Sequence, residues 1–435
     1  MRIVIIGGGA AGMSAASKAK RINADSEVIV YDSGGFVSYA ECGIPYFLGG
    51  KIDDYGKLIH YPITEFTEKR GIIVRTNTSV SSINPEKKEI FFDNGTSESY
   101  DRLIICTGAS PKVPQKFKDS GALAIRTLDS GIDIRKKLKP GMKVTIIGDG
   151  VLGMELASTL KEGGYGTRLI SHHSDLFPRI SREISRQFLE DFRNEIEVEL
   201  ESEILAIEKT NSNFTVKTSK GTHESGIVIF ATGIVPNTSF LKGSSIETTS
   251  TGLIRTNELM QTNFPDIYAA GDCATSRNIV TGKESWNPLA QVSNKMGRVA
   301  GSNAAGERMI FPGSIGTTLV KIFDYEVGFA GLALDESIKA SFNAKRTTVK
   351  ARSRAAYYEG GSEIWVEIIY DVKSGKLLGS QIISKDGGAW RLNAVASAIQ
   401  AGLTVEDLFY TDFGYTPPFG PVWDPIIIAA SLSMK

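Results

Sequence analysis

VIIGGGAAG (residues 4–12) and TIIGDGVLG (residues 145–153) decide how this chain folds. Each has an apolar run rich in β-branched residues, then the pattern G-x-G-x-x-G at the start of a helix-like run. In such a strand–turn–helix unit the first glycine makes the turn, the second lets a pyrophosphate approach the backbone, and the third lets helix pack on strand. One match to this pattern is weak evidence for a nucleotide site, whereas two matches, each between a strand and a helix, predict two dinucleotide-binding domains. The glycines concerned are Gly7, Gly9 and Gly12 in the first stretch and Gly148, Gly150 and Gly153 in the second.

The strand that returns after the first glycine turn ends in a carboxylate. VIVYD (residues 28–32) brings Asp32 to a position about 20 residues beyond Gly12. At that spacing an acidic side chain accepts hydrogen bonds from the ribose of a bound dinucleotide. Asp32 is therefore a candidate ribose-binding residue.

The rest of the chain divides around these two units. Residues 103–111 and 227–236 each run from an apolar strand into Thr-Gly and then a proline, which predicts two crossings between domains. Residues 267–273 return to buried-strand character, so we expect the first domain to be completed after the second, with a helix at 289–305. Beyond Pro312 we expect strands at 319–323, 363–370 and 377–383 and a helix at 393–402, with no glycine fingerprint. The prediction is an α/β fold with two Rossmann-like dinucleotide-binding domains and a C-terminal α+β domain.

Composition limits the function classes. The chain has 435 residues, and its 49 basic and 49 acidic residues leave no net charge to hold it on nucleic acid or an anionic membrane. No apolar stretch approaches the roughly 20 residues of a membrane span, and the first residues show no signal-peptide pattern. The three cysteines form no CxxC pair. We therefore expect a cytoplasmic protein that binds neither nucleic acid nor membrane, and we expect no metal site.

Taken in order, these motifs resemble the two-dinucleotide flavoprotein disulfide reductases over essentially the whole chain. SYAECGIPY (residues 38–46) is similar to the pattern S-x-x-x-C-G-x-P-Y of the single-cysteine branch. That branch contains coenzyme A disulfide reductases, persulfide and polysulfide reductases, NADH oxidases and NADH peroxidases. YTPPFGPVWDP (residues 415–425) is similar to the Y-x-P-P-x segment of the coenzyme A disulfide reductases.

The resemblance implies a cofactor for each domain. It implies FAD in residues 1–110 and 245–312, NADPH or NADH in residues 111–244, and a dimerisation domain in residues 313–435. Asp272 would hold the flavin ribityl chain, and a helix beginning near Ala290 would point its N-terminus at the flavin ring. Glu155 would orient groups on the nicotinamide side. The remaining expected cofactor contacts are Thr107, Gly108, Gly233 and Gly271.

Cys42 is the candidate redox residue. It lies in a polar run before Gly-Ile-Pro, where a helix start could stabilise a thiolate, whereas Cys106 and Cys273 lie in or at the ends of apolar strands and are expected to be inert. Ser38 stands four residues earlier, where a partner thiol would be in reach. Cys42 therefore has no obvious local disulfide partner, and we expect it to react with an external oxidant after hydride from the nicotinamide has reduced the flavin.

Three oxidants are considered: a disulfide such as coenzyme A disulfide, sulfur or polysulfide, and oxygen or peroxide. The resemblance implies a histidine in the first glycine loop of oxidases and peroxidases, and here that position is Ala10. In disulfide-type members, tyrosines at the positions of Tyr358 and Tyr415 could protonate a leaving thiolate. We expect Tyr415 to act on Cys42 of the partner in a homodimer, so that the active site is shared between subunits.

Residues matching a coenzyme A site are also present. They are Ser14, Lys18, Arg21, Ser38, Glu41 and Arg70, and Glu41 departs from the asparagine usual in the branch. The leading hypothesis is a reductase of coenzyme A disulfide or of persulfide and polysulfide sulfur, with coenzyme A as a further bound group. The alternatives are an NAD(P)H oxidase and, from another class, a redox-sensing flavoprotein.

The choice of nicotinamide depends on the strand end after the second glycine turn. NADH-specific sites place an acidic residue there. Here RLI (residues 168–170) is followed by Ser171, His172 and His173, with Arg179 further on, and nothing in this run repels a 2′-phosphate. We therefore expect these four residues to contact the cofactor and NADPH to be accepted, with NADH still possible.

Overall fold

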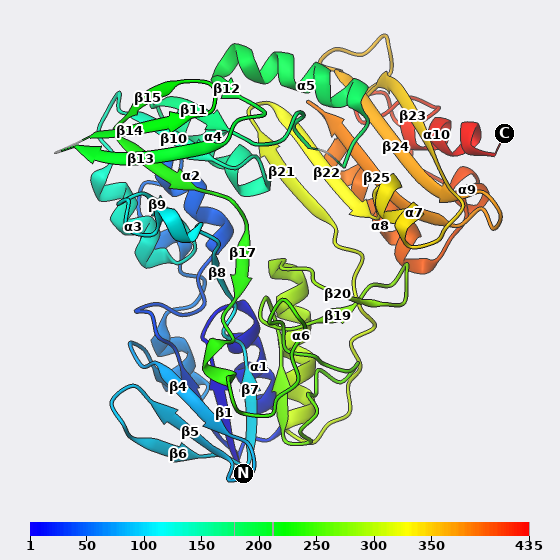
Figure 1. Cartoon of the computed structure of the whole chain (residues 1–435). Helices are drawn as coiled ribbons and strands as arrows, with labels where there is room; N and C mark the ends of the chain where they lie inside the picture. The colour runs from blue at the N-terminus through cyan, green and yellow to red at the C-terminus, as the bar shows by residue number, and fades with distance from the viewer. Residues whose placement is uncertain (178, 211–212, 435) are drawn as a thin grey trace.

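The computed structural model describes residues 1–177, 179–210 and 213–434. Figure 1 shows three bodies: the N-terminal one at the bottom, a second at the upper left, and the C-terminal one at the upper right. The chain passes from the first body to the second, returns to the first, and then enters the third. The predicted class of fold, two dinucleotide-binding domains and a C-terminal domain, is confirmed.

The first domain is built on a five-stranded parallel sheet with the order β18-β7-β1-β2-β3. Its central strands are almost entirely Val and Ile because helices or other segments cover both faces. β1 pairs with β2 on one side and with β7 on the other, so a topological switch point lies at its carboxyl end. The elements are β1 (Arg2–Ile6), α1 (Ala10–Ile22), β2 (Glu27–Tyr31), β3 (Ile73–Arg75), β7 (Arg102–Ile105), β18 (Ile267–Ala269) and α6 (Ala290–Ala304).

The second domain repeats this design. Its parallel sheet has the order β12-β11-β10-β16-β9, and β10 lies between β11 and β16 as β1 lies between β2 and β7. The elements are β9 (Leu123–Ala124), α3 (Leu128–Lys137), β10 (Lys143–Ile147), α4 (Val151–Glu162), β11 (Gly166–Ile170), α5 (Arg182–Glu195), β12 (Glu197–Glu199) and β16 (Ile227–Phe230).

Each parallel sheet is interrupted in sequence by a three-stranded antiparallel insertion, between β3 and β7 in the first domain and between β12 and β16 in the second, and a two-stranded ribbon joins the domains. β8 (Ala109–Pro111) pairs with β17 (Ile234–Pro236) directly after the two Thr-Gly segments, as expected of two adjacent crossings. The insertions are β4 (Val80–Asn84), β5 (Glu89–Phe92) and β6 (Ser97–Ser99) in the first domain and β13 (Ile204–Thr210), β14 (Asn213–Thr218) and β15 (Thr222–Ser225) in the second. The short helix α2 (Ile44–Leu48) and the ribbon β19 (Ser276–Arg277) with β20 (Glu284–Ser285) complete these domains. The domain boundaries given above stay a prediction.

The third domain has an antiparallel sheet with the order β21-β22-β25-β24-β23. The three expected strands are present as β21, β24 and β25, whereas β22 and β23 were not predicted from the sequence. α8 begins five residues before the expected helix start, at Gly388, directly after Gly387, which has a left-handed conformation. The elements are β21 (Thr318–Ile322), β22 (Tyr325–Gly331), α7 (Leu334–Lys339), β23 (Ala344–Arg352), β24 (Glu363–Asp371), β25 (Leu377–Ser384), α8 (Gly388–Ala401), α9 (Val405–Phe409) and α10 (Pro425–Ser433).

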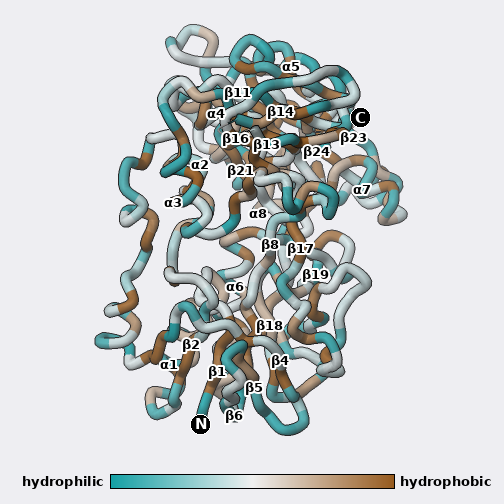
Figure 2. The backbone as a smooth tube through the Cα atoms, turned by 60° about the vertical axis from the view of Figure 1, so that its left-hand side comes forward, coloured by the Kyte–Doolittle hydropathy of each residue, from teal (hydrophilic) through white to brown (hydrophobic). Residues whose placement is uncertain are grey.

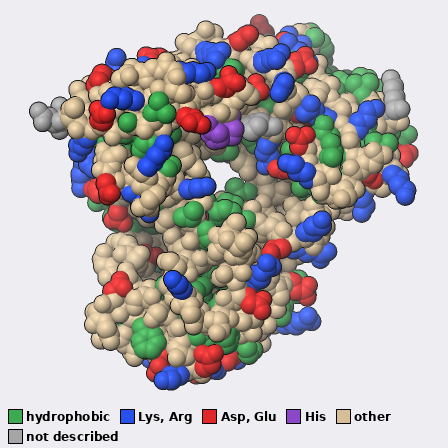
Figure 3. Space-filling model, in the orientation of Figure 1, with side chains coloured by type: hydrophobic (Ala, Val, Ile, Leu, Met, Phe, Trp, Pro, Cys, Tyr) green, Lys and Arg blue, Asp and Glu red, His purple; other side chains and the backbone are tan. Residues whose placement is uncertain are grey.

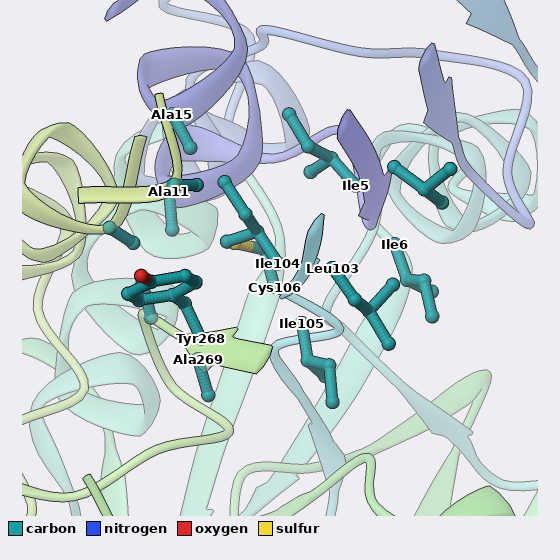
Figure 4. Close-up of a cluster of buried hydrophobic side chains, with 14 of the residues drawn as sticks. Ile5, Ile6, Ala11, Ala15, Leu103, Ile104, Ile105, Cys106, Tyr268 and Ala269 are labelled. Carbon is teal, nitrogen blue, oxygen red and sulfur yellow. The ribbon is translucent and has the colours of Figure 1, made fainter. Parts of the chain in front are cut away.

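Apolar residues concentrate in the sheets and in the helix faces that cover them (Figure 2). In the first domain Ile5, Leu103 and Ile104 pack beside α1, and Cys106 belongs to the same buried cluster (Figure 4). On the face seen in Figure 3, side chains of both charge signs are interspersed, and an opening separates the lower body from the upper ones. Among the described residues, no helix is both long and apolar enough to span a membrane.

The second glycine turn offers a matched pair of substitutions. A Cβ at Gly153 would lie 1.9 Å from the carbonyl oxygen of Gly148, whereas a Cβ at Gly150 would meet nothing within 4 Å. We expect Gly153→Ala to lower the free energy of unfolding by about 1–3 kcal/mol, because helix and strand must separate. Gly150→Ala should keep the fold and weaken NAD(P)H binding by about tenfold or more, because the added methyl occupies the approach of the pyrophosphate. Urea unfolding and cofactor titration of both variants measure the two effects; the reverse pattern would contradict them.

Candidate active site

A cavity of about 1270 Å³ lies at the carboxyl ends of β1, β2 and β7. It is lined by the first glycine turn, by residues that follow β2 and β7, and by the start of α6. Open parallel sheets bind ligands at such a switch point. The cavity brings together these residues that the sequence singled out: Gly7, Gly9, Ser14, Lys18, Arg21, Asp32, Ser38, Glu41, Cys42, Arg70, Thr107, Gly108, Gly271, Asp272 and Ala290. Gly12 is not among its lining residues; a Cβ there would lie 1.8 Å from the carbonyl oxygen of Gly7, so it serves packing.

Asp32 is fixed by the backbone around it. Its carboxylate accepts hydrogen bonds from the N–H of Gly8 at 2.6 Å and from the N–H of Gly34 at 2.7 Å. Burial raises the pKa of Asp32, and these two donors act in the opposite direction. The side chain is thus oriented as an acceptor at the end of the cavity near β2.

Arg126, which the sequence analysis missed, joins Asp272 and Glu41 in a partly buried ionic cluster near Cys42. The guanidinium of Arg126 lies 2.6 Å from the carboxylate of Asp272 and 3.2 Å from that of Glu41. The other carboxylate oxygen of Asp272 accepts from the hydroxyl of Ser293 at 2.9 Å. A carboxylate has about four acceptor sites, so Asp272 can still accept from a ligand hydroxyl. Nothing in the motif pattern identifies Arg126, which reaches the cavity from just before α3.

Cys42 lies in the single helical turn Glu41–Gly43, which precedes α2, and its thiol is exposed to the cavity. Other groups of the site oppose the thiolate that the helix start could stabilise. The protein packed around the cavity raises the pKa of the Cys42 thiol, and the carboxylates of Glu155 and Glu41 raise it further, while Arg126 lowers it. Cys106 and Cys273 are buried, and burial raises the pKa of both thiols.

Glu155 joins the second domain to this site. It lies on α4 and accepts a hydrogen bond at 2.9 Å from the hydroxyl of Tyr46, the last residue of the cysteine motif. Burial raises the pKa of Glu155, and the bond from Tyr46 lowers it. Its charge acts on Cys42 because the chain packs α2 against α4.

Removing that charge should make Cys42 more reactive. In Glu155→Gln the thiolate is no longer opposed by this carboxylate, so we expect alkylation of Cys42 by iodoacetamide at pH 8 to be about two- to tenfold faster than in the unmodified enzyme. The rate is followed by mass spectrometry under native conditions. Glu162→Gln, on the same helix, is the matched control and should leave the rate unchanged. An equal rate in Glu155→Gln and the unmodified enzyme would contradict the electrostatic argument.

Three of the helices that begin without a side-chain cap start at a glycine turn or at the wall of the cavity. The N-cap residues of α1, α4 and α6 are Gly9, Gly150 and Leu289, and none of them makes a side-chain cap hydrogen bond. The free N–H groups and positive ends of such helices favour phosphates or a negatively charged ring. Together with Asp32 and Asp272, the first cavity fits FAD, and the turn before α4 fits the pyrophosphate of a nicotinamide dinucleotide.

The strand end after the second glycine turn differs from expectation. Ser171 is 2% exposed, and its hydroxyl oxygen accepts a hydrogen bond from the N–H of His173. Arg179 donates to the carbonyl of Gly331 and to Glu336 of the third domain, so its guanidinium is engaged there. A carboxylate from outside this run reaches the same strand end, because Asp149, in the glycine turn itself, contacts His173.

The remaining predicted residues lie elsewhere. Gly233 follows β16 in a left-handed conformation and lies at the crossing into β17. Tyr358 and Tyr415 are in the third domain, 41% and 47% exposed, and neither is among the residues that line the cavity. The hydroxyl of Tyr415 contacts that of Tyr357 at 2.9 Å, so the structure pairs Tyr415 with a tyrosine that the sequence analysis did not single out.

A buried arginine fixes the loops that carry these tyrosines. Arg391 on α8 is fully buried and binds the carboxylate of Asp424 at 2.8 Å. It also donates to the carbonyls of Ser353 and Phe419. One side chain therefore holds the segment before Tyr357 and the segment after Tyr415 in a fixed relation.

Two parallel-sheet nucleotide domains, joined by paired crossings and with an accessible cysteine beside the first nucleotide turn, define a two-dinucleotide flavoprotein oxidoreductase. The chain belongs to the pyridine nucleotide-disulphide oxidoreductase family: the family's profile matches residues 1–297, and that of the family's dimerisation domain matches residues 317–425. Its cofactors are accordingly FAD and a nicotinamide dinucleotide.

Proteins similar to this chain include two curated relatives. It is 37% identical over 436 residues to the NAD(P)H coenzyme A polysulfide/persulfide reductase of Pyrococcus horikoshii, covering 99% of this chain and 97% of the relative. It is 32% identical over 452 residues to an NADH oxidase of Methanocaldococcus jannaschii, covering 100% and 99%. The solved structure of a NAD-dependent persulfide reductase from A. fulgidus is 30% identical, with a TM-score of 0.94, covering 100% of this chain and 83% of that one.

Proposed function

We propose that this protein is an FAD-dependent NAD(P)H oxidoreductase that reduces coenzyme A disulfide or persulfide and polysulfide sulfur through Cys42. The observation that supports this most directly is the position of the Cys42 thiol, which is exposed in the cavity, while the other two cysteines are buried. An accessible cysteine without a second thiol in reach forms its disulfide bond with a sulfur atom of an external molecule. A relative that acts on coenzyme A polysulfide or persulfide supports the substrate class.

In the proposed reaction, the Cys42 thiolate attacks one sulfur of the substrate. The substrate S–S bond breaks, a Cys42–sulfur bond forms, and the second sulfur leaves as a thiolate that takes up a proton. When bound, the flavin supplies the two electrons of the nicotinamide hydride to this site. Reduction of the Cys42–sulfur bond then regenerates the Cys42 thiolate and releases the second thiol. The balance is one disulfide, one NAD(P)H and one proton giving two thiols and NAD(P)⁺.

Residues around the cavity suit a phosphorylated substrate. Lys18, Arg21 and Arg70 line it, and they are joined by Lys295 and Arg298 from α6. Cationic side chains around one opening attract an anion such as a nucleoside phosphate. Ser14 and Ser38 line the same cavity, and Glu41, bound to Arg126, occupies the position next to Cys42. We propose these residues as the coenzyme A site.

The third domain supports a shared active site. Tyr415 and Tyr357 contact each other on its surface, where Phe419 and Trp423 are 72% and 60% exposed. Exposed aromatic side chains of this kind are typical of an interface. We propose a cytoplasmic homodimer in which the phenol of Tyr415 protonates the thiolate that leaves Cys42 of the partner, with Tyr358, the residue after Tyr357, as a second candidate donor.

The second candidate function is NAD(P)H oxidation by oxygen, which the similarity to an NADH oxidase favours. The histidine expected of such enzymes is replaced by Ala10, which lines the cavity without a titratable group. Steady-state oxidation of NADPH and NADH with coenzyme A disulfide, polysulfide, peroxide and air, compared side by side, tests the choice. Turnover with air that equals turnover with every sulfur substrate would overturn the reductase assignment, and the absence of any turnover would favour a redox-sensing role.

A further inference from the structure

A second cavity, of about 270 Å³, lies between the second and third domains. One wall is α5 of the second domain, which runs along the top of Figure 1 toward the third domain. The other wall is the face of the third domain's sheet that carries Trp365 and Ile383, which lie opposite each other on β24 and β25. The lining residues of this cavity are all different from those of the cavity beside Cys42. The two cavities are therefore separate sites.

Two contacts between the domains fix the walls of this second cavity. At the start of α5, the N–H of Ser181 lies 3.2 Å from each carboxylate oxygen of Glu367 on β24, and both residues are buried. Further along α5, the carboxylate of Asp191 accepts a hydrogen bond from the hydroxyl of Tyr325 on β22. The cavity is therefore formed before a ligand binds, which is typical of small-molecule sites.

Three aromatic rings line the cavity, those of Phe188, Tyr325 and Trp365. Phe188 meets Tyr325 edge to face, with ring centroids 5.2 Å apart and ring planes at 68°. Nζ of Lys385 lies 4.7 Å from the ring centroid of Tyr325, and Nζ of Lys350 lies 5.1 Å from that of Trp365. The face of an aromatic ring attracts a cation through the ring quadrupole. Two of the three rings thus already bind ammonium groups of this chain.

The charged residues of the lining are Asp191, Glu363 and Lys385. Asp191 can accept from a further donor, because a carboxylate has about four acceptor sites and the hydroxyl of Tyr325 fills one of them. Glu363, whose side chain is 62% exposed, pairs with Lys350 at 2.8 Å. Lys385 is exposed and forms no ion pair with another residue that the structure describes, so its ammonium is held by the Tyr325 ring.

We propose that this cavity binds a small organic ammonium ion, with the cationic group against the rings of Tyr325 and Trp365 and close to the carboxylate of Asp191. The ammonium of Lys385 lies on the Tyr325 ring in this structure, and its flexible, exposed stem lets it move into solvent when the ligand takes that place. An anion would face two carboxylates and one ammonium, and an uncharged ligand would gain nothing from the carboxylates. The proposal does not depend on the function proposed for Cys42.

The test compares two probes of similar shape on the FAD-loaded enzyme. They are choline and its uncharged analogue, neohexyl alcohol, in which a tert-butyl group replaces the trimethylammonium group. We expect choline to bind at least about tenfold more tightly, because only the cation is attracted by the rings and by Asp191. Dissociation constants are measured by ligand-observed NMR titration. Equal constants for the two probes, or the absence of choline binding, overturn the proposal.

Pivalate, the carboxylate that carries the same tert-butyl group, tests the opposite charge. We expect it to bind more weakly than choline, because the two carboxylates of the lining repel it. Tighter binding of pivalate than of choline would show an anion site held by Lys385, and the proposal would be wrong.

Two variants assign choline to this cavity. Asp191→Asn keeps an acceptor for the Tyr325 hydroxyl and removes the charge, so it should weaken choline binding about three- to tenfold and leave the alcohol unchanged. Lys385→Met removes the competing ammonium from an exposed position, so it should strengthen choline binding by a similar factor of about three to ten. Because Lys385 is exposed, this second variant keeps the test decisive even if Asp191→Asn fails to fold.

Glu190→Gln is the matched control for Asp191→Asn. Glu190 is the preceding residue of α5, is exposed and is not among the residues that line the cavity. Its loss of charge should change choline binding by less than about twofold, since the side chain is surrounded by water. A loss of affinity in Glu190→Gln equal to that in Asp191→Asn, or weaker choline binding in Lys385→Met, would contradict the placement of the ligand in this cavity.

Discussion

Cys42→Ser is expected to lower the reduction of coenzyme A disulfide or polysulfide on the order of 10³-fold or more, because the sulfur that forms the covalent intermediate is removed. The variant should keep FAD and should still accept hydride, since Asp32, Asp272 and the glycine turns are unchanged. Bleaching of the flavin absorbance by NAD(P)H without a disulfide, and turnover with a disulfide, measure the two properties separately.

The two buried cysteines provide the controls. Cys106 and Cys273 are 6% and 0% exposed, so we expect Cys106→Ser and Cys273→Ser to leave turnover largely intact. Their effect should instead fall on stability, because each serine hydroxyl replaces a thiol in an apolar environment. Severe loss of turnover in Cys106→Ser together with a mild effect of Cys42→Ser would show that the redox assignment is wrong.

Mixing two inactive variants should restore activity. If Cys42 of one subunit works with Tyr415 of the other, a heterodimer of Cys42→Ser and Tyr415→Phe has one site with both lesions and one site with neither. Random pairing makes half of the dimers mixed, so about a quarter of all sites should be intact. Activity is measured after joint refolding with FAD, and native mass spectrometry counts the heterodimers.

The experiment depends on a low activity of Tyr415→Phe alone, which is measured first. Tyr357→Phe is an informative comparison, because the hydroxyls of Tyr357 and Tyr415 are 2.9 Å apart and removal of one leaves the other in place. If Tyr415→Phe is nearly inactive and the mixture stays as inactive as its parents while heterodimers form, then the site lies within one chain and the role of Tyr415 across subunits is wrong.

The glycine turns and the cysteine motif could be predicted from the sequence because each depends on the conformation and chemistry of a few consecutive residues. Gly7 and Gly148 are followed by helices in the structure, as the spacing predicted, and the returning strand places Asp32 beside the first glycine turn. Buried parallel strands are continuous apolar runs, so β1, β10 and β16 could be recognised from residue type alone. The crossings also followed from local signals, Thr-Gly before a proline.

Side chains that act through contacts between segments far apart in sequence could not be predicted from the sequence. Arg126 meets Asp272 only because the start of α3 reaches a cavity built from segments far apart in sequence. Glu155 acts on Cys42 because α2 packs on α4, and its carboxylate and the burial of the thiol both raise the pKa of Cys42. β22 and β23 lacked a distinct alternation, and tertiary pairing with β25 and β24 decided them.

The sequence by itself determined the class of fold, the two nucleotide turns and the choice of Cys42 as the candidate redox residue, because each depends on the chemistry of a few consecutive residues. The tertiary structure alone decided the charges around Cys42, the partner of Tyr415, and the covering of Asp149 by His173. Electrostatic interactions act through space, and burial in low-dielectric surroundings changes their strength. Two residues 24 positions apart, Asp149 and His173, could be recognised as one pair only after β10 and β11 had been placed side by side.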